Sequence, residues 1–195
     1  LNPNGCNRQF ILLTTAQKNA PLLNVKFSTS RGILQQFIER NEAQLFALTA
    51  RDAVADALPA SVVSMKWPND VLVTGADGVE RKIAGVLAEL VTATSAVVLG
   101  VGVNTAMRRA DLPVPTATSV DVERGLETTD AVALADKIAA DIVRGVLHRV
   151  AALAAAGGAA SAAGLSAEVN TACSTIGRHV RVSLPGDRVL TGVAI

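Results

Sequence analysis

The stretch Val62–Val103 reads VVSMKWPNDVLVTGADGVERKIAGVLAELVTATSAVVLGVGV, in which short runs of β-branched and aliphatic residues are separated by polar ones. Such runs are typical of strands. Gly75–Gly78 has the composition of a turn, and Thr92–Thr94 is short enough to close a hairpin. The strands predicted here are Val62–Lys66, Asp70–Thr74, Ile83–Val91 and Ala96–Val103. Their short links predict an antiparallel or mixed sheet rather than βαβ units.

The residues that precede this stretch add strands and helical structure. Phe10–Thr14 and Asn24–Ser28 read as two further strands, with a polar loop over Gln17–Pro21 between them. Apolar residues at spacings of three and four predict helical structure over Ile33–Leu58, which Pro59 ends. The expected fold is therefore α+β, with a mixed, largely antiparallel sheet flanked by helices.

The C-terminal part changes character twice. An amphipathic pattern predicts a long helix over Thr129–Ala156, and the Ala/Gly-rich stretch Ala151–Ala163 predicts a frayed helix end and a linker. Val180–Leu184 and Arg188–Ala194 then read as one hairpin across a Pro-Gly-Asp turn. Because a lone hairpin is marginal in water, it packs on the main domain or belongs to a small barrel. We therefore expect one domain over residues 1–172 and the start of a second over residues 173–195.

Composition narrows the class of protein. The chain has 195 residues, of which 50% are hydrophobic and 18% charged, so a folded domain is expected rather than disorder. A net charge of +1 gives no electrostatic case for binding nucleic acid or a membrane surface. Two cysteines, Cys6 and Cys173, and two histidines, His148 and His179, form no metal-binding pattern and no histidine triad. A reducing cytoplasm is the simplest setting for so few cysteines.

Lys66–Asp70, with the sequence Lys-Trp-Pro-Asn-Asp, is the segment richest in chemistry. A lysine, an amide and a carboxylate lie within five residues, at the junction of two predicted strands. Lys66 is suited to neutralising phosphate, and Asp70 to holding Mg²⁺ or a sugar hydroxyl. An ordinary β-turn with a solvated lysine and an aromatic plug explains the same residues about equally well.

Two later segments also have polar or small residues where a sheet would otherwise be uniformly apolar. Lys82 enters a predicted strand, and Gly85 within it suggests a close approach to the backbone, although a basic residue and a bulge glycine are the commoner explanation. Gly100 and Gly102 share one face of the next strand and leave a flat surface there, suited to a purine or to tight packing under a helix. Asn104 offers both a donor and an acceptor for an adenine edge.

In this order and at this spacing, these segments resemble the signature segments of the biotin protein ligases. Pro115–Ser119 resembles the Ala-Thr-Ser landmark that precedes the last long helix in that family, and the closing hairpin resembles the start of its SH3-like C-terminal domain. The similarity runs over about Phe46–Ile195. It implies a catalytic domain of the fold shared with class II aminoacyl-tRNA synthetases, over residues 1–172. It also implies the monofunctional type, without an N-terminal DNA-binding domain or repressor activity.

The resemblance implies a two-step, ATP-dependent reaction. Biotin is adenylated and then passed to a lysine of a biotin carboxyl carrier protein or of a carboxylase biotin domain, with ATP, biotin and Mg²⁺ as the small molecules. It leaves open whether the protein is a monomer or a weak dimer. By residue, it implies that Lys82 and Lys66 are catalytic. The implied biotin contacts are Gln17, Lys82, Gly85 and Leu87, the implied ATP contacts are Lys66, Asn69, Asp70 and Asn104, and the implied metal ligand is Asp70.

One family landmark is missing from the sequence. The Gly-Arg-Gly-Arg-X-Gly-Arg loop that closes over biotin has no counterpart. Leu12–Ala20 resembles the strand that leads into it, and the chain then passes directly to Leu22–Ser28, which resembles the strand that follows. Either the protein lacks the loop, which would compromise adenylation, or a segment is missing from the sequence at Ala20–Leu22, the account that we favour. Two rival functions therefore stay open: a lipoate-type ligase of the same fold, which the segment Lys66–Asp70 argues against, and a biotin-binding or carrier-docking protein without catalysis.

Overall fold

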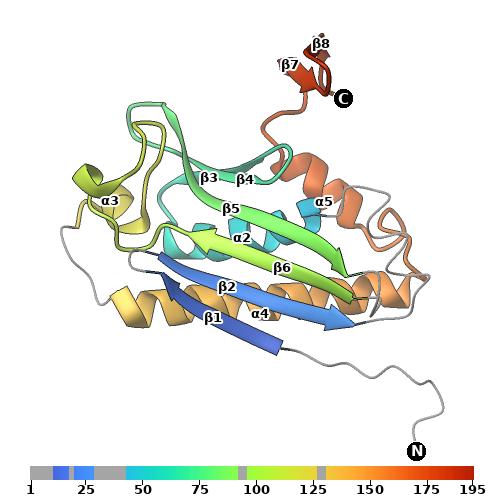
Figure 1. Cartoon of the computed structure of the whole chain (residues 1–195), viewed down its shortest axis with the longest axis horizontal. Coiled ribbons are helices and arrows are strands. Elements are labelled where there is room, and N and C mark those ends of the chain that lie inside the picture. Colours follow the sequence, from blue (N-terminus) through green and yellow to red (C-terminus); the bar gives the residue numbers. More distant parts are fainter. Residues whose placement is uncertain (1–10, 18–19, 29–42, 92–95, 127–130) are drawn as a thin grey trace, which may run out of the picture.

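A six-stranded sheet forms the centre of the fold (Figure 1). The computed structural model describes residues 11–17, 20–28, 43–91, 96–126 and 131–195. The strand order is β1-β2-β6-β5-β4-β3, and each neighbouring pair is antiparallel. The strands are β1 (Ile11–Gln17), β2 (Ala20–Ser28), β3 (Val62–Lys66), β4 (Asp70–Thr74), β5 (Glu80–Val91) and β6 (Ala96–Val103). The expected α+β class with a largely antiparallel sheet is confirmed.

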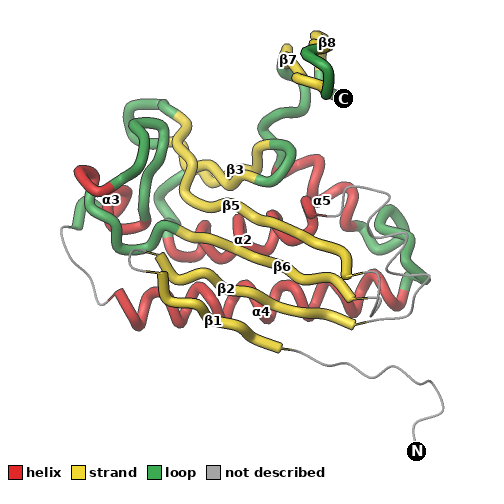
Figure 2. Tube along the Cα trace, viewed as in Figure 1, coloured by secondary structure: helices red, strands yellow, loops and turns green. Residues whose placement is uncertain are grey.

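Helices cover one face of this sheet and leave the other open (Figures 1 and 2). Helix α2 packs against β3, β4 and β5, and α4 packs against α2 and β2. A short 3-10 helix and α3 lie in the connection that follows β6. The bounds are α2 (Ala43–Ala57), η2 (Arg109–Asp111), α3 (Val120–Arg124), α4 (Ala131–Ala155) and α5 (Leu165–Ala172). No helix among the described residues has the length and apolar character needed to span a membrane.

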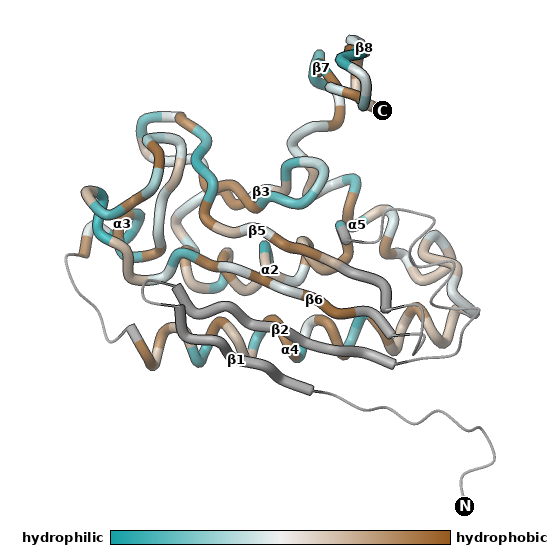
Figure 3. Tube along the Cα trace, in the orientation of Figure 1, coloured by the Kyte–Doolittle hydropathy of each residue, from teal (hydrophilic) through white to brown (hydrophobic). Residues whose placement is uncertain are grey.

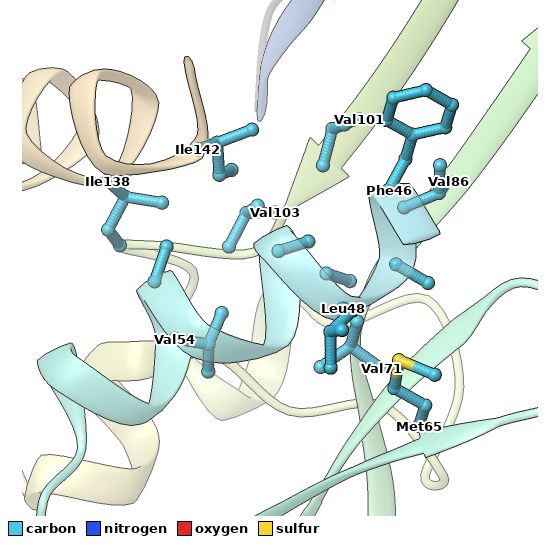
Figure 4. Packing of buried hydrophobic residues seen from close by; sticks show 14 of the residues in the cluster. Phe46, Leu48, Val54, Met65, Val71, Val86, Val101, Val103, Ile138 and Ile142 are labelled. Atoms are coloured by element: carbon cyan, nitrogen blue, oxygen red, sulfur yellow. The ribbon is translucent and has the colours of Figure 1, made fainter. Parts of the chain in front are cut away.

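The core lies between the sheet and the two long helices (Figure 4). Helix α2 packs against the sheet on one side and against α4 on another, so its residues 45–50 are all buried. Helix α4 contributes one stripe, because its buried residues recur at helical spacing while polar residues alternate with them along the chain (Figure 3). The buried residues of that stripe are Leu134, Ile138, Ile142, Val146 and Leu153. The sheet contributes Val71, Val73, Ile83, Val86, Leu99, Val101 and Val103.

Most of the predicted elements are confirmed. The strands predicted for β3, β4 and β6 have the predicted bounds, and β5 begins three residues before the predicted Ile83, at Glu80. The predicted helix over Thr129–Ala156 is α4, and the one over Ile33–Leu58 corresponds to α2 from Ala43, while residues 33–42 lie outside the described residues. Helices α3 and α5 were not predicted.

The loop predicted over Gln17–Pro21 is wrong. Gln17 still belongs to β1 and pairs with Ala20, so only residues 18–19 connect the two strands. Pro21 lies within β2 and pairs with Ala16. Proline lacks the N–H that a strand residue donates to its neighbour. Pro21 is tolerated because β2 pairs with β6 only from Leu22 onward, so no bond to β6 is lost at Pro21.

The C-terminal hairpin is a separate two-stranded sheet that projects from the main body (Figure 1). It consists of β7 (His179–Leu184) and β8 (Arg188–Val193), each within one residue of the predicted bounds. Its base is tied to the main sheet, because the Arg178 guanidinium donates to both carboxylate oxygens of Glu80, at 2.8 and 2.6 Å. The hairpin therefore begins from a fixed point at the start of β5.

Leu48 is the natural test of the core, because its side chain is fully buried at the centre of α2. We expect Leu48→Ala to lower the free energy of unfolding by about 3 kcal/mol, since it leaves a cavity between helix and sheet. Leu147→Ala on α4, where the leucine is 38% exposed, is the matched control and should cost less than about 1 kcal/mol. Urea unfolding followed by circular dichroism measures both, and equal losses would contradict the placement of the core.

The Arg178–Glu80 pair predicts a pH-dependent contribution to stability. Its hydrogen bonds, and more weakly the charges of Arg178 and Lys66, lower the pKa of Glu80 from its ordinary value of 4.5. The folded state therefore favours the carboxylate. The stabilisation is present above pH 4.5 and is lost as the pH falls through the lowered pKa.

Glu80→Gln should thus lower the free energy of unfolding by at most about 1 kcal/mol at pH 7, as for exposed ion pairs. The difference from the wild type should shrink as the pH falls below 4.5 and through the lowered pKa of Glu80. Thermal unfolding at several pH values measures this, and a difference that does not change between pH 7 and pH 3 would show that the ion pair is not its cause.

Candidate active site

The strand register places several of the predicted site residues in one row. Lys66 pairs with Asp70, Asp70 pairs with Gly85, and Gly85 pairs with Gly102. Directly opposed residues in a sheet lie on the same face, with neighbouring strands about 4.8 Å apart. The row therefore crosses β3, β4, β5 and β6 on the face that the helices leave open.

A β-bulge brings Lys82 onto the same face. Pairing of β4 with β5 passes from Val71↔Ala84 to Leu72↔Lys82, so Ile83 is an extra residue on β5. Ile83 and Ala84 are consecutive, yet both are buried, at 0% and 3% exposure. Without the bulge, Lys82 would alternate onto the buried face with Ala84. With it, the Lys82 side chain is 49% exposed beside the row.

Lys82 is held on both sides. Its Nζ lies 2.5 Å from Oδ1 of Asp70, forming an ion pair. A Cβ at Gly85 would lie 3.2 Å from the same Nζ, so the absence of a side chain there leaves room for the ammonium group. The Lys82 N–H donates to the carbonyl of Thr116 at 2.8 Å, and the Thr118 N–H donates to the Lys82 carbonyl at 2.9 Å. The backbone that carries the Lys82 ammonium group is thus fixed by hydrogen bonds to Thr116 and Thr118.

The turn between Lys66 and Asp70 is fastened to β5. Both backbone and side chain of Asn69 bond with Val86: the Val86 N–H donates to the Asn69 carbonyl at 2.9 Å, and Nδ2 of Asn69 donates to the Val86 carbonyl at 2.8 Å. Trp67 is 43% exposed, so it is not the buried aromatic plug of the alternative interpretation, and its peptide bond to Pro68 is cis. The amide oxygen of Asn69 and the second hydrogen of its Nδ2 are left for a ligand.

Asn104 has a similar structural role after β6. Its N–H donates to the Ile83 carbonyl and its Nδ2 donates to the Thr118 carbonyl, both at 2.9 Å. Its own carbonyl accepts from the Val120 N–H. One Nδ2 hydrogen is used within the protein, so the amide oxygen and the second Nδ2 hydrogen are what Asn104 would offer to an adenine edge.

The glycines of β6 lie beside the predicted biotin contacts. Gly102 pairs with Gly85 and Gly100 pairs with Leu87, so all four positions share the open face, as the alternating glycines predict. The Leu87 side chain is 68% exposed there. Gln17 ends β1, which β2 and β6 separate from β5. Its backbone is therefore roughly 14 Å from that of β5, and its side chain lies outside the described part of the structure.

Other residues support the site but were not singled out in the sequence. The Thr118 hydroxyl donates to Oε1 of Glu123 at 2.5 Å, and the Ser119 hydroxyl accepts from the Val122 N–H and caps α3. Both lie in the Ala-Thr-Ser landmark, the sequence feature that could have identified them.

Arg81, at the start of β5, donates twice to Asp77, at 3.0 and 2.5 Å, and so lowers the pKa of that carboxyl.

The arrangement suits Mg²⁺ only as an ion that arrives with phosphate. Within residues 43–91, 96–126 and 131–195, no three His, Cys, Asp or Glu side chains gather as a metal cluster. Asp70 is the one carboxylate in the row. Since protein-bound Mg²⁺ commonly uses one or two carboxylates and completes its shell with substrate phosphates and water, Asp70 fits that role.

Comparison with known proteins shows what the chain as a whole resembles. Residues 1–93 match the model of a family of unknown function, DUF6638. Over 149 residues, or 75% of this chain, the sequence is 35% identical to a biotin–[acetyl-CoA-carboxylase] ligase of Mycobacterium tuberculosis. The chain spans about half of that relative's length, 49%.

Solved structures agree on the fold. The crystal structure of the biotin protein ligase from Aquifex aeolicus superposes with a TM-score of 0.65 at 18% identity, over 88% of this chain and 68% of that one. The same enzyme in complex with biotin and ATP gives a TM-score of 0.58 at 20% identity, over 88% and 66%. The resemblance carried by the sequence motifs is thus confirmed: the chain is a homologue of the biotin protein ligases and has the fold of their catalytic domain.

Proposed function

We propose that the protein is an ATP-dependent ligase that forms biotinyl-5′-adenylate and transfers biotin to a lysine of a biotin carboxyl carrier protein or carboxylase biotin domain. One observation carries the proposal: a lysine, Lys82, is turned by a β-bulge onto the open face and stands 2.5 Å from Asp70. The relatives' names support biotin and ATP as the substrates. The cytoplasm, suggested by the cysteine content, is the proposed compartment.

In the first step, a carboxylate oxygen of biotin attacks the α-phosphorus of ATP. A phosphorus–oxygen bond forms, and the bond to the β-phosphate breaks, so pyrophosphate leaves with its electron pair. Both reactants are anionic and repel each other, and a fixed cation between them lowers that repulsion most where charge accumulates. Lys82 supplies this cation. On substrate binding it exchanges Asp70 for the biotin carboxylate and the α-phosphate. Asp70 would then hold the Mg²⁺ that accompanies ATP, whose charge would neutralise the phosphates.

The remaining residues of the open face bind the two substrates around Lys82. Lys66 faces the triphosphate, while the amide oxygens of Asn69 and Asn104 contact the nucleotide. Gly85 and Leu87, with Gln17 farther along the sheet, line the place for biotin. The flat surface over Gly100 and Gly102 admits a ring that side chains would exclude.

In the second step, the amine of a carrier lysine attacks the mixed anhydride. A carbon–nitrogen bond forms, the bond to AMP breaks, and the amine loses a proton. No covalent intermediate with the enzyme is required, so a histidine or cysteine nucleophile is not needed. The open face allows a carrier domain to approach.

One observation favours a second function, that of a biotin-binding or carrier-docking protein without catalysis. Strands β1 and β2 are joined only by residues 18–19, which leaves no place there for the biotin-closing loop of the family. A protein without that loop would bind biotin but retain the adenylate poorly. Intact-mass measurement of the purified protein decides whether additional residues are present between Ala20 and Leu22.

Lys82→Ala tests the proposed chemistry. We expect biotin-dependent pyrophosphate release from ATP and Mg²⁺ to fall by at least about 100-fold, because the only proposed cation between the reacting anions is removed. Lys137→Ala is the matched control, since this lysine lies 59% exposed on α4 and pairs with Asp141. Biotin binding without pyrophosphate release in the wild type would instead support the second function, and lipoate outcompeting biotin would support a lipoate-type ligase.

Gly85→Ala tests the space around the lysine. The added Cβ would press on Nζ and Cε of Lys82, at 3.2 and 3.3 Å, and move the ammonium away from Asp70. We expect the adenylation rate to fall about three- to tenfold while the unfolding temperature stays nearly constant, because only the flexible end of Lys82 must shift. Gly192→Ala, in a strand and without neighbours within 4 Å, is the control. Unchanged kinetics in Gly85→Ala would contradict the role of the close approach.

A further inference from the structure

The segment that leads into the C-terminal hairpin runs along β3, an edge strand of the main sheet. Cys173 forms a parallel bridge with Met65, and both the N–H and the hydroxyl of Ser174 donate to the Met65 carbonyl, at 2.8 and 3.1 Å. These contacts fix the segment beside the last residues of β3, immediately before the turn that carries the proposed ATP contacts.

Thr175 continues this contact into the turn itself. The Trp67 N–H donates to the Thr175 hydroxyl at 3.0 Å. Trp67 follows Lys66 directly and comes two residues before Asn69, which Val86 of β5 binds from the other side. The turn is therefore held between β5 and the C-terminal segment, across 108 residues of sequence in the case of Thr175.

A third contact closes the arrangement. Arg178, three residues after Thr175, makes its two bonds to Glu80 at the start of β5, the strand that also carries Lys82. Residues 173–178 thus contact both strands from which the proposed catalytic lysines come.

We propose that Thr175 is a positioning residue for ATP: through the Trp67 N–H it sets the turn in which Lys66, Asn69 and Asp70 are held toward the triphosphate. The proposal rests on the proposed ligase function for its substrate. The contact itself requires only that the Thr175 hydroxyl determines how the turn lies. The C-terminal segment then contributes to nucleotide recognition without touching the nucleotide.

Thr175→Val tests this, because valine keeps the shape of threonine and removes the hydroxyl acceptor. Thr175→Ser restores the acceptor. Thr171→Val is the matched control, since the Thr171 hydroxyl donates to the Ala167 carbonyl within α5 and does not contact the turn. The first readout is independent of activity: Trp67 is the only tryptophan of the chain, so its emission maximum and acrylamide quenching report on the turn directly. Both should change in Thr175→Val alone.

The second readout is kinetic. The KM for ATP should rise about fivefold in Thr175→Val, in line with the loss of one hydrogen bond, while kcat and the KM for biotin change less than about twofold. Thr175→Ser should behave as the wild type. Trp67 emission identical in Thr175→Val and Thr171→Val, or equal effects on the KM values of ATP and biotin, would overturn the proposal. If the wild type releases no pyrophosphate, the ligase function fails, and the fluorescence comparison alone decides whether Thr175 sets the turn.

Discussion

The extra residue in β5 is the constraint on which the rest of the site depends. Antiparallel pairing forces side chains to alternate between the two faces of a sheet, and here one face is filled by helices. A strand without a bulge would bury either Lys82 or Gly85. Because Ile83 is inserted at the bulge, both come to the open face, and the Ile83 and Ala84 side chains go into the core together. The bulge thus allows one strand to serve the core and the site at once.

The division of the sheet into a packed and an open face explains where polar groups occur. On the packed face, Val71, Val86 and Val101 are almost completely buried against α2 and α4 (Figure 4). On the open face the same strands carry a lysine, a carboxylate and glycines, whose charge and small size are useful only where ligands can approach. The fixed backbone beneath them comes from the packed face, so the rigidity of the site depends on the core.

Sequence patterns predicted the sheet better than the site geometry. Runs of β-branched residues gave the bounds of β3, β4 and β6, since these strands alternate regularly. The side of the sheet to which Lys82 points could not be read from such a pattern, because simple alternation puts it with the buried Ala84. Helix α5 follows an Ala/Gly-rich stretch, and its own sequence predicts a helix only weakly. It forms because Leu165 and Val169 are buried against the rest of the fold, and this packing outweighs the weak helix propensity. Thr175 lies 108 residues from its partner in sequence, and no local pattern links the two.

The strip of chain at residues 173–175 has a consequence for the solubility of the fold. It covers part of β3, whose outer backbone groups would otherwise be free to pair with another molecule. Val62, at the other end of β3, is already 67% exposed. A fragment cut at residue 172 would therefore uncover an apolar strand edge able to template edge-to-edge aggregation. The linker to the hairpin thus protects the sheet edge from aggregation, and a truncated form made for expression should end after this linker.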